Sequence, residues 1–108
     1  MNKYRAKKVS LEGHVFDSKA EARRYGELRL MQKSDDIADL RIHPIFPLVV
    51  NGTKISSYVA DFRYYDSYKN CWVVEDVKSP VTAKLPAFIM KKKLMLALYG
   101  IEVKEVRA

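Results

Sequence analysis

The dipeptide Asn51-Gly52 places the strongest constraint on the fold, because it is the preferred centre of a type I′ turn between antiparallel strands. It separates two runs rich in β-branched and aromatic residues, 45–50 and 54–65, and turn residues then lead to a third run at 71–78. We therefore expect a three-stranded antiparallel meander, with Pro47 at an edge or a bulge.

The segment before the meander predicts a hairpin and a helix. Short alternation around Gly13 indicates a small hairpin or an extended arm over residues 9–16. Ser18 is followed three residues later by Glu21, which is the capping-box pattern of a helix start. We expect this helix to end near Lys33.

The segment after the meander predicts one more helix and one more strand. Pro86 suits the first turn of a helix, since its missing N–H would be unpaired there, and Gly100 suits the position after the last turn. We expect a helix over 86–99 and a strand over 101–106. The expected fold is mixed α/β: helix, three-stranded antiparallel meander, helix and strand, with the helices packed on the sheet.

The length of 108 residues predicts one domain, residues 1–108, in which residues 1–8 form a basic N-terminal arm. The 20 Lys and Arg residues outnumber the 13 Asp and Glu residues, and a net charge of +7 favours a nucleic-acid partner. No apolar run approaches the roughly 20 residues that cross a bilayer. The single cysteine, Cys71, excludes an internal disulfide and fits a reducing compartment. We therefore expect a cytoplasmic protein with an anionic partner and no membrane contact.

Charged residues within the meander indicate a functional site. If the second and third strands pair across a four-residue turn, Asp61 lies opposite Asp76, and Lys78 points to the same face. Two adjacent carboxylates repel each other unless a cation lies between them, and a few oxygen ligands with room for water favour Mg²⁺. Glu75 points to the opposite face, toward a surface or cross-strand contact. The alternative is an exposed aspartate on an open sheet face beside a surface ion pair.

Helical positions add to this site. Glu21 shares a stripe with Tyr25 and Leu28, so it either faces the sheet as a metal-binding acid or caps the helix. Lys92 lies within the apolar stripe of the last helix, where it either extends to solvent or reaches the site. The residues expected to contact DNA phosphates are Lys7, Lys8, Arg24, Lys91 and Lys92.

Three segments together resemble the PD-(D/E)XK nuclease superfamily. They are Phe16-Asp17-Ser18-Lys19-Ala20-Glu21-Ala22, Tyr58-Val59-Ala60-Asp61-Phe62 and Val74-Glu75-Asp76-Val77-Lys78. The resemblance extends over nearly the whole chain and implies a restriction endonuclease-like core. More narrowly, the sequence is similar to small phage proteins interpreted as Holliday junction resolvase-like endonucleases. It departs from the motif in having alanine where the superfamily name has proline.

The resemblance implies a role for each motif residue. Asp61 and Asp76 hold the metal, Glu21 binds it directly or through water, and the carbonyl of Val77 is a further ligand. Lys78 positions the attacking water. The implied cofactor is Mg²⁺, for which Mn²⁺ can substitute.

We therefore expect a Mg²⁺-dependent endodeoxyribonuclease that hydrolyses phosphodiester bonds in branched DNA, such as a four-way junction, and acts as a homodimer. If the protein is phage-encoded, its compartment is the host cytoplasm. The alternatives are a non-catalytic DNA-binding module, a nicking endonuclease subunit that needs a partner protein, and a small factor that binds a host enzyme. A nucleophilic serine hydrolase is disfavoured, since Gly-x-Ser-x-Gly is absent and neither His14 nor His43 has an obvious partner. We expect His14 in the hairpin and His43 in a loop.

Overall fold

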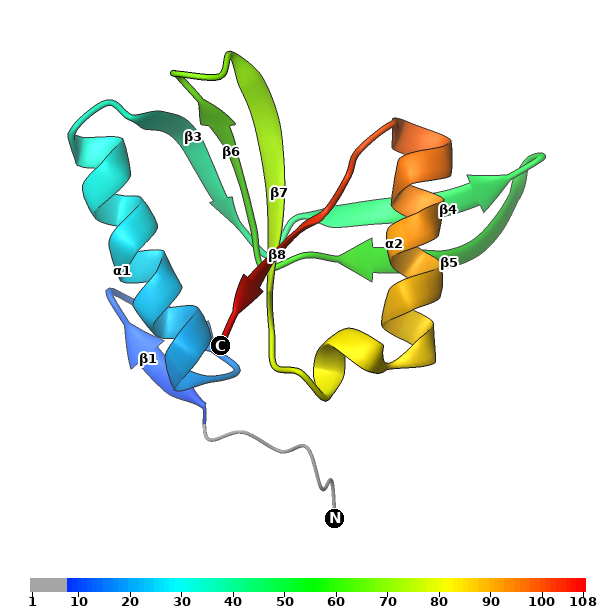
Figure 1. Ribbon diagram of the computed structural model, residues 1–108, viewed down its shortest axis with the longest axis horizontal. Helices are drawn as coiled ribbons and strands as arrows, with labels where there is room; N and C mark the ends of the chain where they lie inside the picture. The colour runs from blue at the N-terminus through cyan, green and yellow to red at the C-terminus, as the bar shows by residue number, and fades with distance from the viewer. Residues whose placement is uncertain (1–7) are drawn as a thin grey trace.

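The structure, a computed structural model, describes residues 8–108 (Figure 1). Lys7 and the rest of the predicted basic arm before Lys8 lie outside the described residues. The described chain has two α-helices, α1 (Lys19–Lys33) and α2 (Pro86–Tyr99), and one short 3-10 helix, η1 (Thr82–Lys84). Its strands are β1 (Val9–Leu11), β2 (His14–Phe16), β3 (Ile37–Ile42), β4 (Ile45–Val50), β5 (Thr53–Val59), β6 (Phe62–Asp66), β7 (Cys71–Lys78) and β8 (Lys104–Arg107).

Both helices begin and end where the local sequence signals place them. Ser18 is the N-cap of α1, and its Oγ accepts a hydrogen bond of 3.1 Å from the Glu21 N–H. Pro86 opens α2, and Gly100 follows it with a left-handed φ of 67°. The chain from Gly100 caps the helix before it becomes a strand, since the Ile101 N–H donates to the carbonyl of Met95. β8 therefore starts at Lys104, later than the sequence predicts.

The central sheet has four strands in the order β3-β6-β7-β8. β3 and β7 are both antiparallel to β6, whereas β8 is parallel to β7. The β6–β7 register pairs Phe62 with Glu75 and Asp66 with Cys71, and this confirms the predicted register. The fold is mixed α/β, as expected.

The prediction of a three-stranded meander from residues 45–50, 54–65 and 71–78 is wrong in two respects. The sequence predicts one strand over residues 54–65, but the structure divides it into β5 and β6, which belong to different sheets. The chain bends between them because backbone hydrogen bonds hold both sides of the bend: Ala60 N–H donates to the Pro44 carbonyl, and His43 N–H donates to the Asp61 carbonyl. The third antiparallel strand of the central sheet is β3, which the sequence analysis does not predict.

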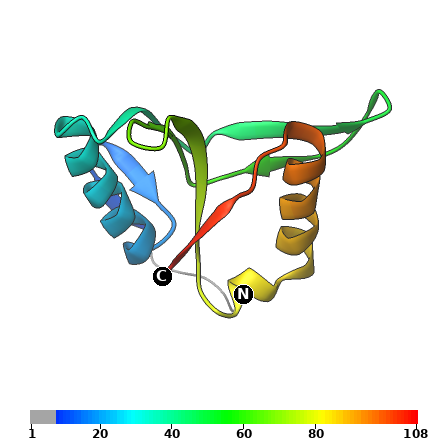
Figure 2. The same cartoon turned by 45° about the horizontal axis from the view of Figure 1, so that its top comes forward.

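Two apolar cores lie on opposite faces of the central sheet, and Figures 1 and 2 place α1 and α2 on opposite sides of β6 and β7. The core beneath α1 is built from aromatic and aliphatic residues that include Phe16, Tyr25, Leu28, Phe62 and Tyr64. The core beneath α2 includes Leu48, Tyr58, Val74, Phe88 and Met95. The alternating faces of β6 and β7 thus supply both cores.

β4 and β5 form a separate two-stranded ribbon that extends beside α2 (Figures 1 and 2). One face contributes Leu48 and Tyr58 to the core beneath α2. The outer face carries exposed apolar side chains, namely Ile45, Ile55 and Val59. The register shifts between Leu48 and Val49, as a bulge would produce. Neither described helix has the length and apolar content needed to cross a membrane.

Candidate metal centre

Glu21 reaches the edge of the central sheet from the first turn of α1. Its side chain is 5% exposed. One carboxylate oxygen, Oε1, lies 2.6 Å from Nε2 of His43, and the other accepts a weak hydrogen bond of 3.4 Å from the Asp17 N–H. Since the backbone of Glu21 donates to Ser18, the residue takes part in capping the helix while its carboxylate faces the sheet. The two predicted roles of Glu21 are therefore compatible.

The carboxylates of Asp61 and Asp76 are neighbours where β6 begins beside β7. Asp61 directly precedes β6, and its N–H donates to the Glu75 carbonyl at 3.1 Å, one position off the register that pairs Glu75 with Phe62. The regular pairing therefore ends at Phe62, and the predicted strand pair of Asp61 with Asp76 is not formed. Its Oδ2 accepts a hydrogen bond of 2.7 Å from the Val77 N–H. Val77 thus contacts the site through its N–H, whereas the prediction concerned its carbonyl oxygen.

Asp76 is 2% exposed and is held by two neighbours. The buried hydroxyl of Tyr58 donates to its Oδ2, and Nζ of Lys78 lies 3.7 Å from the same oxygen. The Lys78 ammonium also lies 4.6 Å from the centroid of the Phe88 ring, in a cation–π arrangement. The acid and the lysine of the predicted motif therefore share one face of β7, as the sequence predicts.

The carboxylates of Glu21, Asp61 and Asp76 concentrate negative charge where the side chains are largely buried. Burial, together with the neighbouring carboxylates of Asp76 and Glu21, raises the pKa of Asp61 to about 8, although the hydrogen bond from Val77 acts in the opposite direction. Burial and the charge of Asp76 also raise the pKa of Tyr58, so its hydroxyl stays protonated as a donor. Without a counter-ion, the ionised form of Asp61 is therefore costly at neutral pH.

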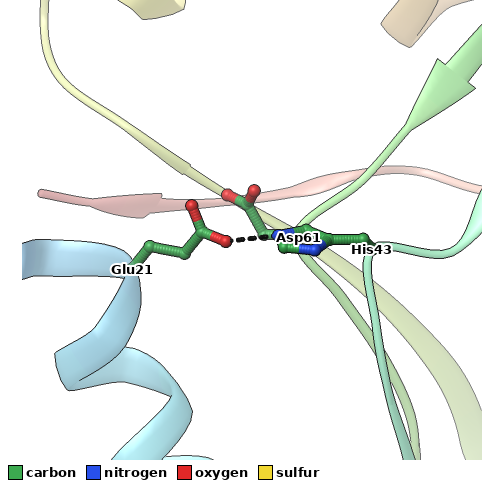
Figure 3. A group of neighbouring side chains, drawn as sticks. All are labelled: Glu21, His43 and Asp61. Carbon is green, nitrogen blue, oxygen red and sulfur yellow. Dashed lines mark hydrogen bonds and ion pairs between the residues drawn. The ribbon is translucent and has the colours of Figure 1, made fainter. Parts of the chain in front are cut away.

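His43 belongs to this cluster, although the sequence analysis leaves it without a partner. It lies in the two-residue connection between β3 and β4, where its left-handed φ of 51° and its N–H bond to the Asp61 carbonyl fix the backbone. Figure 3 shows the Glu21 carboxylate directed at the imidazole, with Asp61 beside them. The position of His43 depends on β3, so the sequence carries no local signal that joins it to Glu21.

Glu75 lies on the opposite face of β7, as predicted, but it is fully buried rather than at the surface. Nε and Nη2 of Arg24 donate to its two carboxylate oxygens at 2.8 and 2.7 Å, and the hydroxyl of Tyr64 donates as well. The Arg24 side chain is only 16% exposed. Arg24, predicted to contact DNA, is therefore held inside the protein by Glu75, and we assign it a structural role.

The other predicted DNA contacts lie in different surroundings. Lys91 lines a hollow of about 260 Å³ together with Asp76 and Lys78. Nζ of Lys92 is bound to Glu105 at 2.5 Å, so this ammonium is already paired. Lys8 is largely exposed and lies 3.9 Å from a carboxylate oxygen of Asp17. Among Lys8, Lys91 and Lys92, it is therefore Lys91 that lines the same hollow as Asp76 and Lys78.

Comparison with known proteins places the chain in a family. A family model described as "Protein of unknown function (DUF1064)" matches residues 1–107. The chain belongs to the DUF1064 family. No curated protein and no solved structure gives a significant match to it.

The donor set of the DUF1064 chain fits a divalent cation. Glu21, His43 and Asp61 each offer one ligand atom, and these atoms all lie within 4.8 Å of one another. Octahedral coordination at about 2.1 Å spaces adjacent ligands by about 3 Å and opposite ligands by about 4.2 Å, so the three atoms need only small shifts. Asp76 stands next to this group, with its Oδ2 facing Tyr58 and Lys78. Carboxylates suit Mg²⁺ and Mn²⁺, and an imidazole ligand favours the transition metal.

Proposed function

We propose that this protein is a Mg²⁺- or Mn²⁺-dependent endodeoxyribonuclease of the PD-(D/E)XK type, acting on branched DNA as a homodimer. The observation that carries the proposal is the convergence of three carboxylates and a lysine at one end of the β6–β7 pair. Glu21 and Asp61 offer ligand atoms within 4.8 Å, and Lys78 lies 3.7 Å from Asp76. Such a cluster is stable only if a cation or a proton neutralises part of its charge.

The topology supports the same proposal. If the β4–β5 ribbon is treated as an insertion, the remaining order is α1, β3, β6, β7, α2 and β8, with β3, β6 and β7 antiparallel. This is the order of helix, three antiparallel strands, helix and strand that a restriction endonuclease-like core has. Asp61 then lies at the start of the second core strand, and Asp76 and Lys78 lie on the third.

In this proposal the residues of the site have separate roles in phosphodiester hydrolysis. A divalent cation held at this site would supply positive charge to the phosphate oxygens as negative charge develops on them. Glu21, His43 and Asp61 are placed to hold the cation, and Tyr58 fixes the orientation of Asp76 through its hydrogen bond. The Lys78 ammonium is placed to orient a water molecule toward a phosphorus atom, and Lys91 is placed to bind an adjacent phosphate.

The test is a cleavage assay with purified protein. Labelled linear duplex, nicked duplex and a four-way junction are each incubated with Mg²⁺, Mn²⁺ or EDTA, and size-exclusion chromatography with light scattering gives the oligomeric state. We expect metal-dependent cutting that favours the junction, and a loss of about 100-fold or more in Asp76→Asn and in Lys78→Met. The matched control is Asp35→Asn, which changes an exposed carboxylate outside the cluster and should cut normally.

Two results would count against the proposal. Cutting that persists in Asp76→Asn and Lys78→Met would exclude this site as its source. Tight junction binding without cutting under any metal would instead favour a DNA-binding module or a subunit that needs a partner protein.

A further inference from the structure

An exposed aromatic patch lies at the turn end of β6 and β7, and we define it as Arg63, Tyr65 and Trp72. Trp72 is 54% exposed, and its ring meets the Tyr65 ring edge-on with centroids 5.3 Å apart. The guanidinium carbon of Arg63 lies 5.1 Å from the Trp72 ring centroid. The Trp72 ring is thus about half open to solvent beside a cation, with the half-buried Tyr65 ring at its edge.

The patch shares a sheet face with the candidate metal centre. Directly opposed residues of an antiparallel pair point to the same face, and Tyr65 is opposite Trp72 while Arg63 is opposite Val74. Because the side-chain period of a strand is two, Trp72 and Asp76 also point to one face of β7. Asp76 follows Trp72 by four positions along the strand, a distance of about 13 Å.

The Arg63 guanidinium of the patch is only partly hydrogen-bonded within the protein. Nε of Arg63 is buried and has no acceptor within the described part of the chain. The nearest carboxylate oxygen, from Asp39, is 3.8 Å from Nη2, which is too long for a good hydrogen bond. Nε is out of reach of a ligand, but the guanidinium as a whole is only loosely paired beside the exposed ring.

A hollow of about 450 Å³ adjoins Trp72. Lys69 stands on its wall, together with one carboxylate, Glu102, whereas the ammonium of Lys104 lies 4.0 Å from Glu75 on the opposite face of β7. An aromatic face for a base and ammonium groups for the neighbouring phosphates are the two components of single-strand binding sites. A surface for an apolar protein partner would instead be poor in lysine.

We propose that the aromatic patch binds an unpaired nucleobase of single-stranded DNA, which stacks on Trp72 while Arg63 and Lys69 attract the backbone. In a continuous duplex each base is already stacked on both faces, so the patch selects DNA in which a base is unpaired. This inference deepens the proposed function by naming the feature of branched DNA that is recognised, and it rests on that function only for the link to cleavage.

Trp72 is the only tryptophan of the chain, so its fluorescence reports on the patch directly. The probe is a twenty-residue oligothymidylate, titrated in EDTA at low salt so that no cutting occurs. The comparison is a covalently closed duplex circle, which has no unpaired ends. We expect saturable quenching by the oligonucleotide that salt reverses, and much weaker quenching by the closed duplex.

Variants test the contribution of the ring by anisotropy of a labelled oligothymidylate. Trp72→Leu should weaken binding between about 5-fold and about 150-fold, whereas Trp72→Phe should keep most of the affinity. Arg63→Gln gives a second variant, expected to weaken binding a few-fold. The matched control is Tyr68→Leu, since Tyr68 is 80% exposed but makes no ring contact with the patch in the described structure. Circular dichroism verifies that each variant is folded.

The outcomes separate this inference from the proposed function. If Trp72→Leu changes neither junction cutting nor oligonucleotide affinity, the proposal that the aromatic patch binds a nucleobase is refuted. The proposed nuclease activity is not affected by that result. Equal weakening by Tyr68→Leu and Trp72→Leu would also overturn it. Quenching by the oligonucleotide in a protein that cuts nothing would support the patch and count against the nuclease.

Discussion

Replacing Asp61 by asparagine tests the carboxylate cluster without any assumption about a substrate. The side chain keeps its shape, and the amide oxygen can still accept the hydrogen bond from Val77 N–H, but the residue can no longer ionise. Any difference between the variant and the native protein that depends on pH therefore reports the charge of Asp61.

The magnitude follows from the shifted pKa. Burial and the adjacent carboxylates raise the pKa of Asp61 from 3.8 to about 8, so the folded protein retains a proton that the unfolded chain has released. Stability is then greatest at low pH and falls as the pH rises from about 4 to about 8. At about 1.4 kcal/mol per pKa unit, this one group removes about 3 to 4 kcal/mol of stability between pH 5 and pH 8.

The assay is urea unfolding in EDTA at pH 5 and pH 8, followed by circular dichroism. The native protein should lose about 3 kcal/mol more than Asp61→Asn between the two pH values. Addition of Mg²⁺ or Mn²⁺ at pH 8 should restore stability to the native protein and have little effect on the variant, because a bound cation replaces the proton. Asp35→Asn, outside the cluster, should behave as the native protein does. Parallel pH dependence of the native protein and Asp61→Asn would refute the reasoning.

Three further substitutions follow from single contacts, and each is measured by urea unfolding. Arg24→Leu should destabilise the fold by about 3 to 5 kcal/mol, since it leaves a buried carboxylate without its partner, and adding Glu75→Gln should recover much of that loss. Tyr58→Phe should cost about 1 to 3 kcal/mol, because it removes a buried hydrogen bond to Asp76. Ser18→Ala should cost about 1 kcal/mol through loss of the α1 cap.

Each of these substitutions has a matched control. Arg23→Leu changes the exposed arginine beside Arg24. Tyr65→Phe removes a hydroxyl for which the described structure gives no hydrogen bond, and Ser10→Ala changes an exposed serine in β1. We expect changes within about 0.5 kcal/mol for all three. A control as damaging as its counterpart would mean that the named contact is not the cause.

Local signals predicted the parts of the fold that depend on neighbouring residues. The cap at Ser18, the helix start at Pro86 and the helix end at Gly100 are set within one turn of chain. The β6–β7 register is likewise local, because a four-residue turn fixes it from the pair Asp66 and Cys71 to the pair Phe62 and Glu75, but it ends one residue before the predicted pair of Asp61 with Asp76.

The remainder depends on contacts between distant segments. The β propensity of a segment does not determine which strand it pairs with. The bend at Ala60, after which the chain passes from the sheet of β5 to the sheet of β6, could therefore not be predicted from propensity. His43 joins the cluster only because β3 pairs with β6. The partner of Glu75 lies 51 positions away in the sequence, at Arg24, and alternation alone does not distinguish a buried ion pair from a surface charge.

The β4–β5 ribbon has consequences for handling the protein in concentrated solution. A ribbon of two strands has two open edges, and within the described chain nothing covers the outer face that carries Ile45, Ile55 and Val59. We expect separate copies to associate through this face at millimolar concentration, since apolar side chains and unpaired backbone groups are exposed together. Replacing Ile55 and Val59, the outer apolar residues of β5, by threonine would keep the β propensity and make the surface more polar. Both substitutions leave the metal-centre residues unchanged.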